Sequence, residues 1–272
     1  MKIAIYLLLL SGYAGQLSAD PESDRLAFVK FYESKFPGIA IGEHKDGTYV
    51  LSKEKREQWL EMEDFPPYEF AVDDGEVLFT TQFSNGKGYV DCFPNGSNGV
   101  KQNYPYFDVA SRQVITLELA INNCREKNSE EHLDYLSDEM GYLTAYLAFA
   151  SRGHRFNIKV PAEGLGAYEN GKQFFYARRG QLDFACSSCH LDAAGGKLRA
   201  EFLSASVGHV THWPAYRFKW EQVGGLHKRF VECNEQIGAE GLAQQGETYR
   251  NLEYFLTYMS NGMELNGPSS RK

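Results

Sequence analysis

The stretch DFACSSCHLD, residues 183–192, decides the fold, because it holds two cysteines separated by two residues and followed at once by a histidine. Two thiols at this spacing can add to the vinyl groups of a haem, and the adjacent imidazole can ligate its iron. The alternatives are a disulfide between Cys186 and Cys189 beside an idle histidine, or half of a zinc site, for which the sequence offers no second cysteine pair. The motif predicts one covalently bound haem c, attached at Cys186 and Cys189, with His190 as an iron ligand.

The chain begins MKIAIYLLLLSGYAGQLSAD, with one lysine, an apolar run and then small residues. This order is typical of a secretory signal peptide at residues 1–19, and we expect cleavage after Ala19. The apolar run is too short to cross a bilayer and no later segment is apolar enough, so we expect an exported protein that has no membrane partner. The formal net charge of −8 and the absence of a basic run argue against a nucleic-acid partner.

The rest of the chain contains one pattern twice. At a shift of 109 residues, NYPYFD (103–108) aligns with HWPAYR (212–217), and Cys124 aligns with Cys233. Upstream of these stretches the shift falls to about 97, so the second copy carries extra residues after its cysteine motif. Agreement at this many fixed positions indicates a duplicated domain.

Helical patterns repeat with the same shifts. Two apolar stripes at helical spacing are Met140, Leu143, Leu147 and Ala150 in the first copy and Tyr249, Leu252, Leu256 and Met259 in the second. Gly153 and Gly262 follow these stripes, at positions where a left-handed residue ends a helix. Each copy also has an entry helix with a Gly-x-x-x-Phe spacing, at Gly75 and Phe79 and at Gly171 and Phe175.

An entry helix, a cysteine-bearing loop, an irregular proline-containing stretch and a C-terminal helix suit a class I cytochrome c. We therefore expect a mainly α protein of two tandem class I cytochrome c-like domains related by duplication. The first, at 20–157, is haem-less and carries an N-terminal extension, and the second, at 158–272, binds haem c. Only the second is expected to bind haem, because Phe93 stands in the first copy where His190 stands in the second.

Three segments fall outside the repeated pattern. Residues 23–39 are expected to form an amphipathic helix, and residues 46–70 to mix turns with charged chain. Both are expected to wrap the first domain or to contact a partner. The final residues, GPSSRK, are expected to be a frayed tail.

Each of the five cysteines needs an explanation in an oxidising compartment. Two are assigned to the haem. Cys92 and Cys124 of the first domain are expected to join in a disulfide, and the alternative is a pair of free buried thiols. Cys233 is left over, and a leftover thiol in an exported protein is a reactive group or an intermolecular link.

Cations precede this leftover thiol in LHKRFVECNEQ. Arg229 lies one helical turn before Cys233, so the guanidinium and the sulfur are expected on one face of a helix. His227 and Lys228 are expected to add positive charge, which would favour the thiolate and attract a small dianion. The alternative for Arg229 is a surface ion pair with an acid such as Glu232.

The export signal, one Cys-x-x-Cys-His in the second of two cytochrome-like repeats, HWPAYR and KRFVEC together closely resemble the SoxA family. Its members are the catalytic subunits of the SoxAX cytochromes of periplasmic thiosulfate oxidation, and the resemblance covers nearly all of the mature chain. It implies an L-cysteine S-thiosulfotransferase that couples thiosulfate oxidatively to a cysteine of the carrier SoxYZ. It also implies a periplasmic location, a heterodimer with a SoxX-type cytochrome c, and electron transfer through haem to a cytochrome c acceptor.

Carried over by position, the resemblance makes His190 the proximal iron ligand and Cys233 both the distal ligand and the persulfide-forming active-site cysteine. Arg229 would bind the anionic substrate. Many family members hold a second haem in the first half, with the equivalent of Cys124 as its axial ligand. The attachment motif is missing there in this chain, so the resemblance is to the single-haem type, and a partner cytochrome becomes more necessary.

The competing reading is a plain periplasmic electron-transfer cytochrome c without a catalytic thiol. Its sixth iron ligand would come from Met259, Met263, His209, His212 or His227. Met259 belongs to an apolar stripe and is expected in the core. Met263 follows a helix-ending glycine and is expected to face solvent. His209 and His212 are expected to bond a haem propionate or to be exposed. A scaffold with a merely structural haem would leave Arg229 and Cys233 unexplained.

Overall fold

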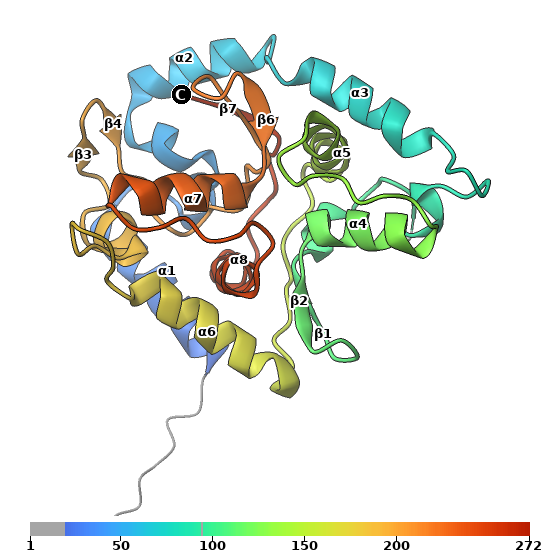
Figure 1. Cartoon of the computed structure of the whole chain (residues 1–272). Coiled ribbons are helices and arrows are strands. Elements are labelled where there is room, and N and C mark those ends of the chain that lie inside the picture. Colours follow the sequence, from blue (N-terminus) through green and yellow to red (C-terminus); the bar gives the residue numbers. More distant parts are fainter. Residues whose placement is uncertain (1–19, 94) are drawn as a thin grey trace, which may run out of the picture.

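The computed structural model describes residues 20–93 and 95–272, so the expected signal peptide at 1–19 lies outside the described residues. Helices dominate the fold (Figure 1). In chain order they are α1 (Pro21–Lys35), η1 (Ile41–Leu51), α2 (Lys53–Glu63), α3 (Glu69–Thr80), η2 (Tyr89–Asp91), η3 (Lys101–Asn103), α4 (Leu117–Lys127), α5 (Asp138–Phe149), η4 (Ala162–Gly164), α6 (Leu165–Tyr176), η5 (Ser188–Asp192), α7 (Leu226–Gln236) and α8 (Glu247–Met259). Over residues 20–93 and 95–272, every helix is too short or too polar to cross a membrane.

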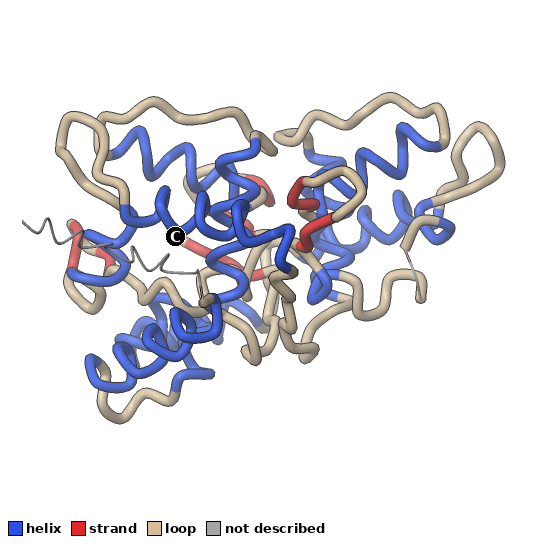
Figure 2. The backbone as a smooth tube through the Cα atoms, turned by 90° about the horizontal axis from the view of Figure 1, so that it is seen from below, coloured by secondary structure: helices blue, strands red, loops and turns tan. Residues whose placement is uncertain are grey.

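The strands are short and lie between helices. They are β1 (Tyr106–Asp108), β2 (Gln113–Ile115), β3 (Lys197–Leu198), β4 (Glu201–Phe202), β5 (Ala215–Arg217), β6 (Gln222–Gly224) and β7 (Ser269–Arg271). β1 pairs with β2 and β3 with β4, each antiparallel. β5 lies between antiparallel β6 and parallel β7. Seen from below in Figure 2, helices flank the short strands near the middle of the molecule on both sides.

Two pairs of helices cross in the same manner. α3 packs on α5, and α6 packs on α8. A Cβ atom on Gly75 would overlap the carbonyl of Tyr142, and one on Gly171 would overlap the carbonyl of Asn251. Each crossing therefore requires a glycine, because any side chain would push the two helix backbones apart. This explains the repeated Gly-x-x-x-Phe spacing in physical terms.

The two C-terminal helices predicted from the apolar stripes are confirmed as α5 and α8. Gly153 has φ 80° and Gly262 has φ 84°, so both adopt the left-handed conformation expected after a helix end. Ser137 caps α5 by accepting a hydrogen bond from the backbone N–H of Met140 at 3.3 Å. Local sequence signals therefore define the ends of these helices well.

The first repeat, between α3 and α5, has a core filled largely by aromatic side chains. Phe93, the counterpart of His190, is 2% exposed there. The members of this core cluster are Phe79, Phe83, Tyr89, Phe93, Val100, Leu117, Ile121, Cys124, Met140, Leu143 and Leu147. These rings occupy the interior of a domain that has no haem attachment motif. The disulfide between Cys92 and Cys124 is present beside this cluster, so the predicted pairing holds and the free-thiol alternative does not.

Removing this disulfide should destabilise the protein measurably. The bond closes a loop with a sequence separation of 32 residues, and a loop of this length contributes about 3–4 kcal/mol by restricting the unfolded chain. The Cys92→Ala/Cys124→Ala variant is expected to lose about 2–4 kcal/mol of unfolding free energy in urea titrations. If its midpoint and slope matched those of the unmodified protein, the disulfide would have no stabilising role.

Both chain ends pack differently from the sequence expectation. α1 was expected to wrap the first repeat or to contact a partner. Its Phe28 ring lies 6.0 Å from the ring centroid of Phe175 and 5.9 Å from that of Phe255, so α1 packs on the second repeat rather than the first. Residues 46–70 form η1 and α2 rather than mainly irregular chain. The final residues form buried strand β7, so the prediction of a frayed tail is wrong. A three-residue strand has no periodic signal, and its burial depends on pairing with the distant β5.

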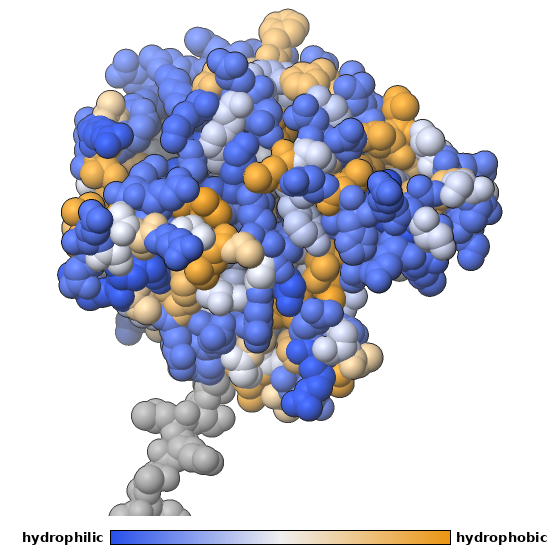
Figure 3. All heavy atoms as spheres, in the orientation of Figure 1, coloured by the Kyte–Doolittle hydropathy of each residue, from blue (hydrophilic) through white to orange (hydrophobic). Residues whose placement is uncertain are grey.

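One face of the molecule (Figure 3) has no single dominant apolar patch. The face seen in Figure 3 is mainly hydrophilic, and its hydrophobic side chains are scattered over several elements. Scattered apolar side chains are normal on a folded protein surface.

Candidate functional site

The cysteine motif lies on a tight turn after α6. Cys186 begins a short helical segment that continues as η5, a π-helical turn covering Ser188–Asp192. The backbone N–H of Ala185 donates to Ser188 Oγ at 3.1 Å and fixes the start of the turn. Cys186 and Cys189 are free, half-buried thiols, so the structure does not join them in the alternative disulfide. Both sulfurs are thus available for other bonds.

One ring nitrogen of His190 is hydrogen-bonded within the protein. Its Nδ1 lies 3.0 Å from the carbonyl oxygen of Ser204. Because a carbonyl can only accept, Nδ1 carries the proton and the lone pair of Nε2 remains available to a metal. Burial lowers the pKa of His190 to about 4, against a partial opposing effect of the Ser204 carbonyl. The imidazole is therefore neutral near pH 7, which is the form that ligates iron.

His209 lies against this imidazole. The two ring centroids are 4.2 Å apart at nearly right angles, and His209 Nε2 lies 3.1 Å from Ser204 Oγ. One serine therefore contacts both histidines through its backbone and its side chain. Burial, followed by the neighbouring His190, holds the pKa of His209 well below its usual range. No sequence pattern indicates this contact, since Ser204 lies in the stretch that has no counterpart in the first repeat and His209 directly follows that stretch.

These residues fit a c-type haem. Two free thiols match its two vinyl groups, and a neutral imidazole with a fixed tautomer matches its iron. Cys186 and Leu191 pack against the large apolar cluster of the second repeat, which can cover a macrocycle. In the first repeat, by contrast, the buried Phe93 offers no ligand atom.

Cys233 belongs to the same neighbourhood. It lies on α7 as a free, half-buried thiol. Burial raises the pKa of Cys186 and of Cys189, and the nearby Cys233 adds to the rise in both cases. The structure thus brings the leftover cysteine of the sequence to the Cys-x-x-Cys-His motif, 43 residues after His190.

Arg229 lies beside Cys233 and also forms the ion pair that was its alternative role. Its Nη1 donates to Glu232 Oε2 at 2.9 Å, and its side chain is 26% exposed. Burial lowers the pKa of Arg229, but Cys233 and Glu232 outweigh this effect and raise it. The guanidinium therefore interacts with both the sulfur and the carboxylate, and the two roles coexist.

Glu232 accepts hydrogen bonds from more than one cation. It accepts hydrogen bonds from Lys219 Nζ at 2.9 Å and Trp220 Nε1 at 2.8 Å, in addition to the one from Arg229. Burial raises its pKa, but these three bonds overcome that and lower the pKa of Glu232 to about 2. One carboxylate is thus shared between two cations, and its bonds fix the direction of the Arg229 side chain.

His227 and Lys228, which were expected to add positive charge near Cys233, make contacts with other residues. His227 Nδ1 accepts from the backbone N–H of Gln245 at 3.0 Å, and its Nε2 lies 3.1 Å from Glu253 Oε2. Lys228 Nζ lies 4.6 Å from the centroid of the Trp220 ring. A helix turns by 3.6 residues, so positions five and six before Cys233 face other directions than position four.

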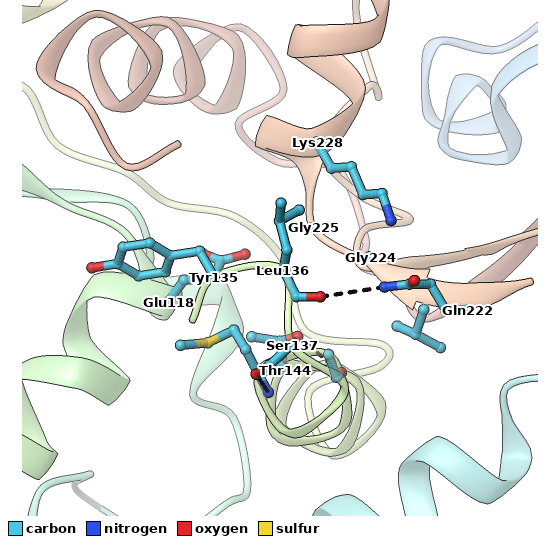
Figure 4. A pocket seen from close by; sticks show the side chains of 12 residues that line it. Glu118, Tyr135, Leu136, Ser137, Thr144, Gln222, Gly224, Gly225 and Lys228 are labelled. Atoms are coloured by element: carbon cyan, nitrogen blue, oxygen red, sulfur yellow. Dashed lines mark hydrogen bonds between the residues drawn. The ribbon is translucent and has the colours of Figure 1, made fainter. Parts of the chain in front are cut away.

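Figure 4 shows where Lys228 lies instead. It lines a small pocket between the two repeats together with Glu118, Leu136 and Gln222. Gln222 Nε2 donates to the carbonyl of Leu136 across this pocket at 3.4 Å. The pocket lies between the repeats, and none of the three free cysteines lines it.

The possible ligands of a simple electron carrier are all buried or half-buried. Met259 is 1% exposed, as expected for a core residue, but Met263 is 4% exposed, so the expectation that it faces solvent is wrong. Its backbone N–H bonds to the carbonyl of Ser260 beyond α8, which turns the chain back into the core. His212 is 7% exposed, and its Nδ1 lies 3.3 Å from the carbonyl of Lys45.

Two arginines near the site were missed from the sequence. Arg217 ends the quoted HWPAYR stretch, and it interacts electrostatically with Arg229 and Cys233. Arg271 belongs to the expected frayed tail but pairs with Arg217 across β5 and β7. Only the long-range strand pairing reveals them, because neither occupies a position with a helical spacing to Cys233.

Comparisons with known proteins show which proteins the chain resembles. The family model of the SoxA/TsdA cytochrome c domain matches residues 74–156 and 170–265. The L-cysteine S-thiosulfotransferase subunit SoxA of Allochromatium vinosum is 49% identical over 258 residues, covering 94% of this chain and 92% of that protein. The protein of the same name from Chlorobaculum tepidum is 46% identical over 252 residues, covering 92% and 88%.

A solved structure shares the fold. The crystal structure of SoxXA from P. pantotrophus superposes with a TM-score of 0.74 at 27% identity. The match covers 82% of this chain and 86% of that chain. The cytochrome c fold expected from the cysteine motif is therefore confirmed.

Proposed function

The chain belongs to the SoxA family, and from that premise we propose how its residues carry out the family's reaction. The chain couples thiosulfate oxidatively to a cysteine of a SoxYZ-type carrier protein, as an L-cysteine S-thiosulfotransferase. The observation that carries this assignment is the meeting of Cys233 and Arg229 with the Cys-x-x-Cys-His motif. A reactive sulfur, a cation for a dianion and a redox centre are the three parts that the reaction needs.

The chemistry sets the task of the residues. A sulfur–sulfur bond forms between the terminal sulfur of thiosulfate and the carrier cysteine, two electrons leave, and the thiol proton is released to solvent. Cys233 would first bond the terminal sulfur of thiosulfate, which is the oxidative step. The carrier thiolate would then take over that sulfur group by an exchange that is redox-neutral and returns Cys233.

The remaining residues would hold the redox centre and the substrate. Cys186 and Cys189 would form the two thioethers, and His190 and Cys233 would supply the iron ligands. When bound, haem c supplies one-electron redox chemistry next to the reactive sulfur. Arg229 would orient the sulfonate of thiosulfate, because a planar guanidinium can bond two oxygens at once. Glu232 is a positioning residue, since it holds Arg229 without touching the substrate.

A partner cytochrome follows from the electron count. The reaction releases two electrons, and one haem accepts one. A SoxX-type cytochrome c subunit would take part in a heterodimer with this chain, and a further cytochrome c would accept the electrons; the SoxXA likeness supports the first of these. The expected export signal supports a periplasmic location, where SoxYZ and thiosulfate would be met.

We further propose that the chain arose by duplication, with boundaries near 20–157 and 158–272, and that only the second domain binds haem. Equivalent helices of the two domains support this, because their first residues are separated by the same number of positions. α4 and α7 begin at Leu117 and Leu226, and α5 and α8 at Asp138 and Glu247, each 109 residues apart. Arg112 and Glu221, also 109 residues apart, both have φ 55°. The aromatic core around Phe93 supports a first domain that does without haem.

Haem counting tests the single-haem proposal. The mature protein should carry one haem per chain, on a peptide that contains Cys186 and Cys189. Cys92 is disulfide-bonded to Cys124, so alkylation should label Cys92 only after reduction. Peptide mapping that located a second haem, or labelled Cys92 without reductant, would overturn the assignment of the first domain.

The function itself is tested by reconstitution. The purified chain with its partner cytochrome, thiosulfate and a SoxYZ-type carrier should produce a carrier whose single reactive cysteine has gained thiosulfate, as measured by intact mass. Production should require an oxidised cytochrome c acceptor. A complex that reduces the acceptor but leaves the carrier unmodified would favour a plain electron-transfer cytochrome.

A further inference from the structure

Two arginines lie side by side on neighbouring strands near the candidate site. Arg217 and Arg271 are register partners on the parallel strands β5 and β7, so their side chains project to the same face. Among the described residues, neither guanidinium has an ion-pair partner, although Glu63 and Asp46 attract Arg271 and Glu232 attracts Arg217 at longer range. Asp46 is itself paired with Arg56 at 2.6 Å. Like charges directly opposite each other destabilise a sheet unless something lies between them.

Both guanidinium groups keep a donor unused. Arg271 is 5% exposed; it donates through Nη1 to the carbonyl of Asp46 at 2.8 Å and through Nε to Ser269 Oγ at 3.1 Å. Its Nη2 is buried and has no hydrogen-bond partner. The Nε of the half-buried Arg217 is also buried and has no hydrogen-bond partner. Buried N–H groups of a charged side chain are rarely left without a partner, because losing their hydration is costly.

Aromatic and small residues hold the pair in place. Arg271 lies 4.8 Å from the ring centroid of Tyr49, and Arg217 lies 5.2 Å from that of Trp220. A Cβ atom on Gly47 would lie 3.3 Å from Arg271 Nη1 and 3.2 Å from His212 Cε1, so a side chain there would crowd both. The two guanidinium groups are thus positioned before any ligand arrives. Burial lowers the pKa of both arginines, and Arg217 adds to the effect on Arg271.

We propose that Arg217 and Arg271 form an oxyanion-binding site, separate from Arg229, that holds a carboxylate of the haem. A paired, buried set of guanidinium donors matches a small oxyanion, and the same chemistry would suit the sulfonate of thiosulfate. Burial favours the carboxylate, because Arg271 is almost closed to solvent and a group attached within the fold can reach it. Arg217 also interacts with Cys233 and Arg229, which places the pair next to the redox centre.

This inference rests on the proposed haem site, and the experiment separates the two. Haem content and turnover of the unmodified complex are recorded first, and their absence would contradict the proposed function. The comparison of Arg217→Gln with the unmodified holoprotein then tests the arginine pair. Arg217 carries the test because it is half-exposed, whereas replacing the buried Arg271 can prevent folding. Lys272→Gln is the matched control, since it removes an exposed cation next to Arg271 in sequence.

The readout is the haem midpoint potential together with the KM for thiosulfate. Losing a cation that neutralises a haem carboxylate should favour ferric iron, lowering the reduced-to-oxidised ratio about tenfold at fixed potential, or about 59 mV. Arg217→Lys should restore part of this change, and KM should stay within about twofold. A KM increase of about tenfold with an unchanged potential would mean that the arginine pair binds the sulfonate of thiosulfate and not a haem carboxylate. The proposal is overturned when Arg217→Gln moves neither quantity more than Lys272→Gln does.

Discussion

Replacing Cys233 by alanine is expected to lower the rate of thiosulfate conjugation on the order of 10³-fold or more, the usual effect of removing a group that bonds the substrate. Its sulfur lies with Cys186 and Cys189 in one neighbourhood, beside a cation suited to thiosulfate. Without the Cys233 sulfur, thiosulfate has no protein sulfur to bond to in the oxidative step. Haem content should remain, because both attachment cysteines are untouched. The measurement is the mass of the carrier after timed incubation.

The disulfide variant provides the control for this result. Cys92→Ala/Cys124→Ala also removes two cysteines, but its site lies in the first repeat. It should melt earlier yet conjugate thiosulfate at close to the normal rate. If Cys233→Ala retained more than about a tenth of the normal rate while the protein stayed folded, the reactive sulfur would have to be sought elsewhere.

Replacing Arg229 by alanine is expected to lower kcat/KM for thiosulfate by about 10- to 150-fold, corresponding to the loss of a charge-assisted hydrogen bond of about 1.5–3 kcal/mol. Its ion pair with Glu232 is partly exposed and contributes under about 1 kcal/mol to stability. The melting temperature and the haem content should therefore change little. Arg229→Lys should recover only part of the activity, because an ammonium cannot bond two sulfonate oxygens in one plane.

Lys228→Ala is the matched control, since the neighbouring cation on α7 faces Trp220 and the pocket between the repeats. Its activity should be nearly normal. If Arg229→Ala retained nearly normal activity, Arg229 would serve only its pair with Glu232, and Arg217 would be the next cation to consider at the sulfur.

The sequence predicted those parts of the fold that depend on local patterns. The apolar stripes beginning at Met140 and Tyr249 predicted α5 and α8, and the left-handed glycines predicted where these helices end. The odd cysteine count, with the absence of a haem motif in the first half, predicted the disulfide. In each case the physical cause, a helical period or a covalent requirement, lies within a short stretch of chain.

Features that depend on long-range packing were not predictable in this way. Nothing local in GPSSRK indicates a strand, because β7 is buried by pairing with β5. α1 was correctly expected to be a helix, but its contact with Phe175 depends on how the chain returns across the second repeat. Met263 was placed outside from its position after Gly262, yet the chain turns inward there.

The candidate site divides in the same way. The four-residue spacing within α7 predicted that Arg229 lies beside Cys233, and the Cys-x-x-Cys-His motif predicted Cys186, Cys189 and His190 as site residues. The role of Glu232 as a shared acceptor, and the contact of Lys228 with an aromatic ring, follow from the position of Trp220, which lies in a separate turn between β5 and β6. A sequence gives the composition of a charged cluster, while its net effect on a sulfur depends on which carboxylates reach it.

The ligation of the iron tests the central claim most directly. The low-spin EPR spectrum of the holoprotein should be that of a histidine–thiolate haem, and Cys233→Met should shift its g values while leaving one haem covalently attached. That result would show that the reactive sulfur ligates the redox centre. An unchanged spectrum in Cys233→Met, with haem still bound, would contradict the claim and favour a plain electron-transfer cytochrome with another sixth ligand.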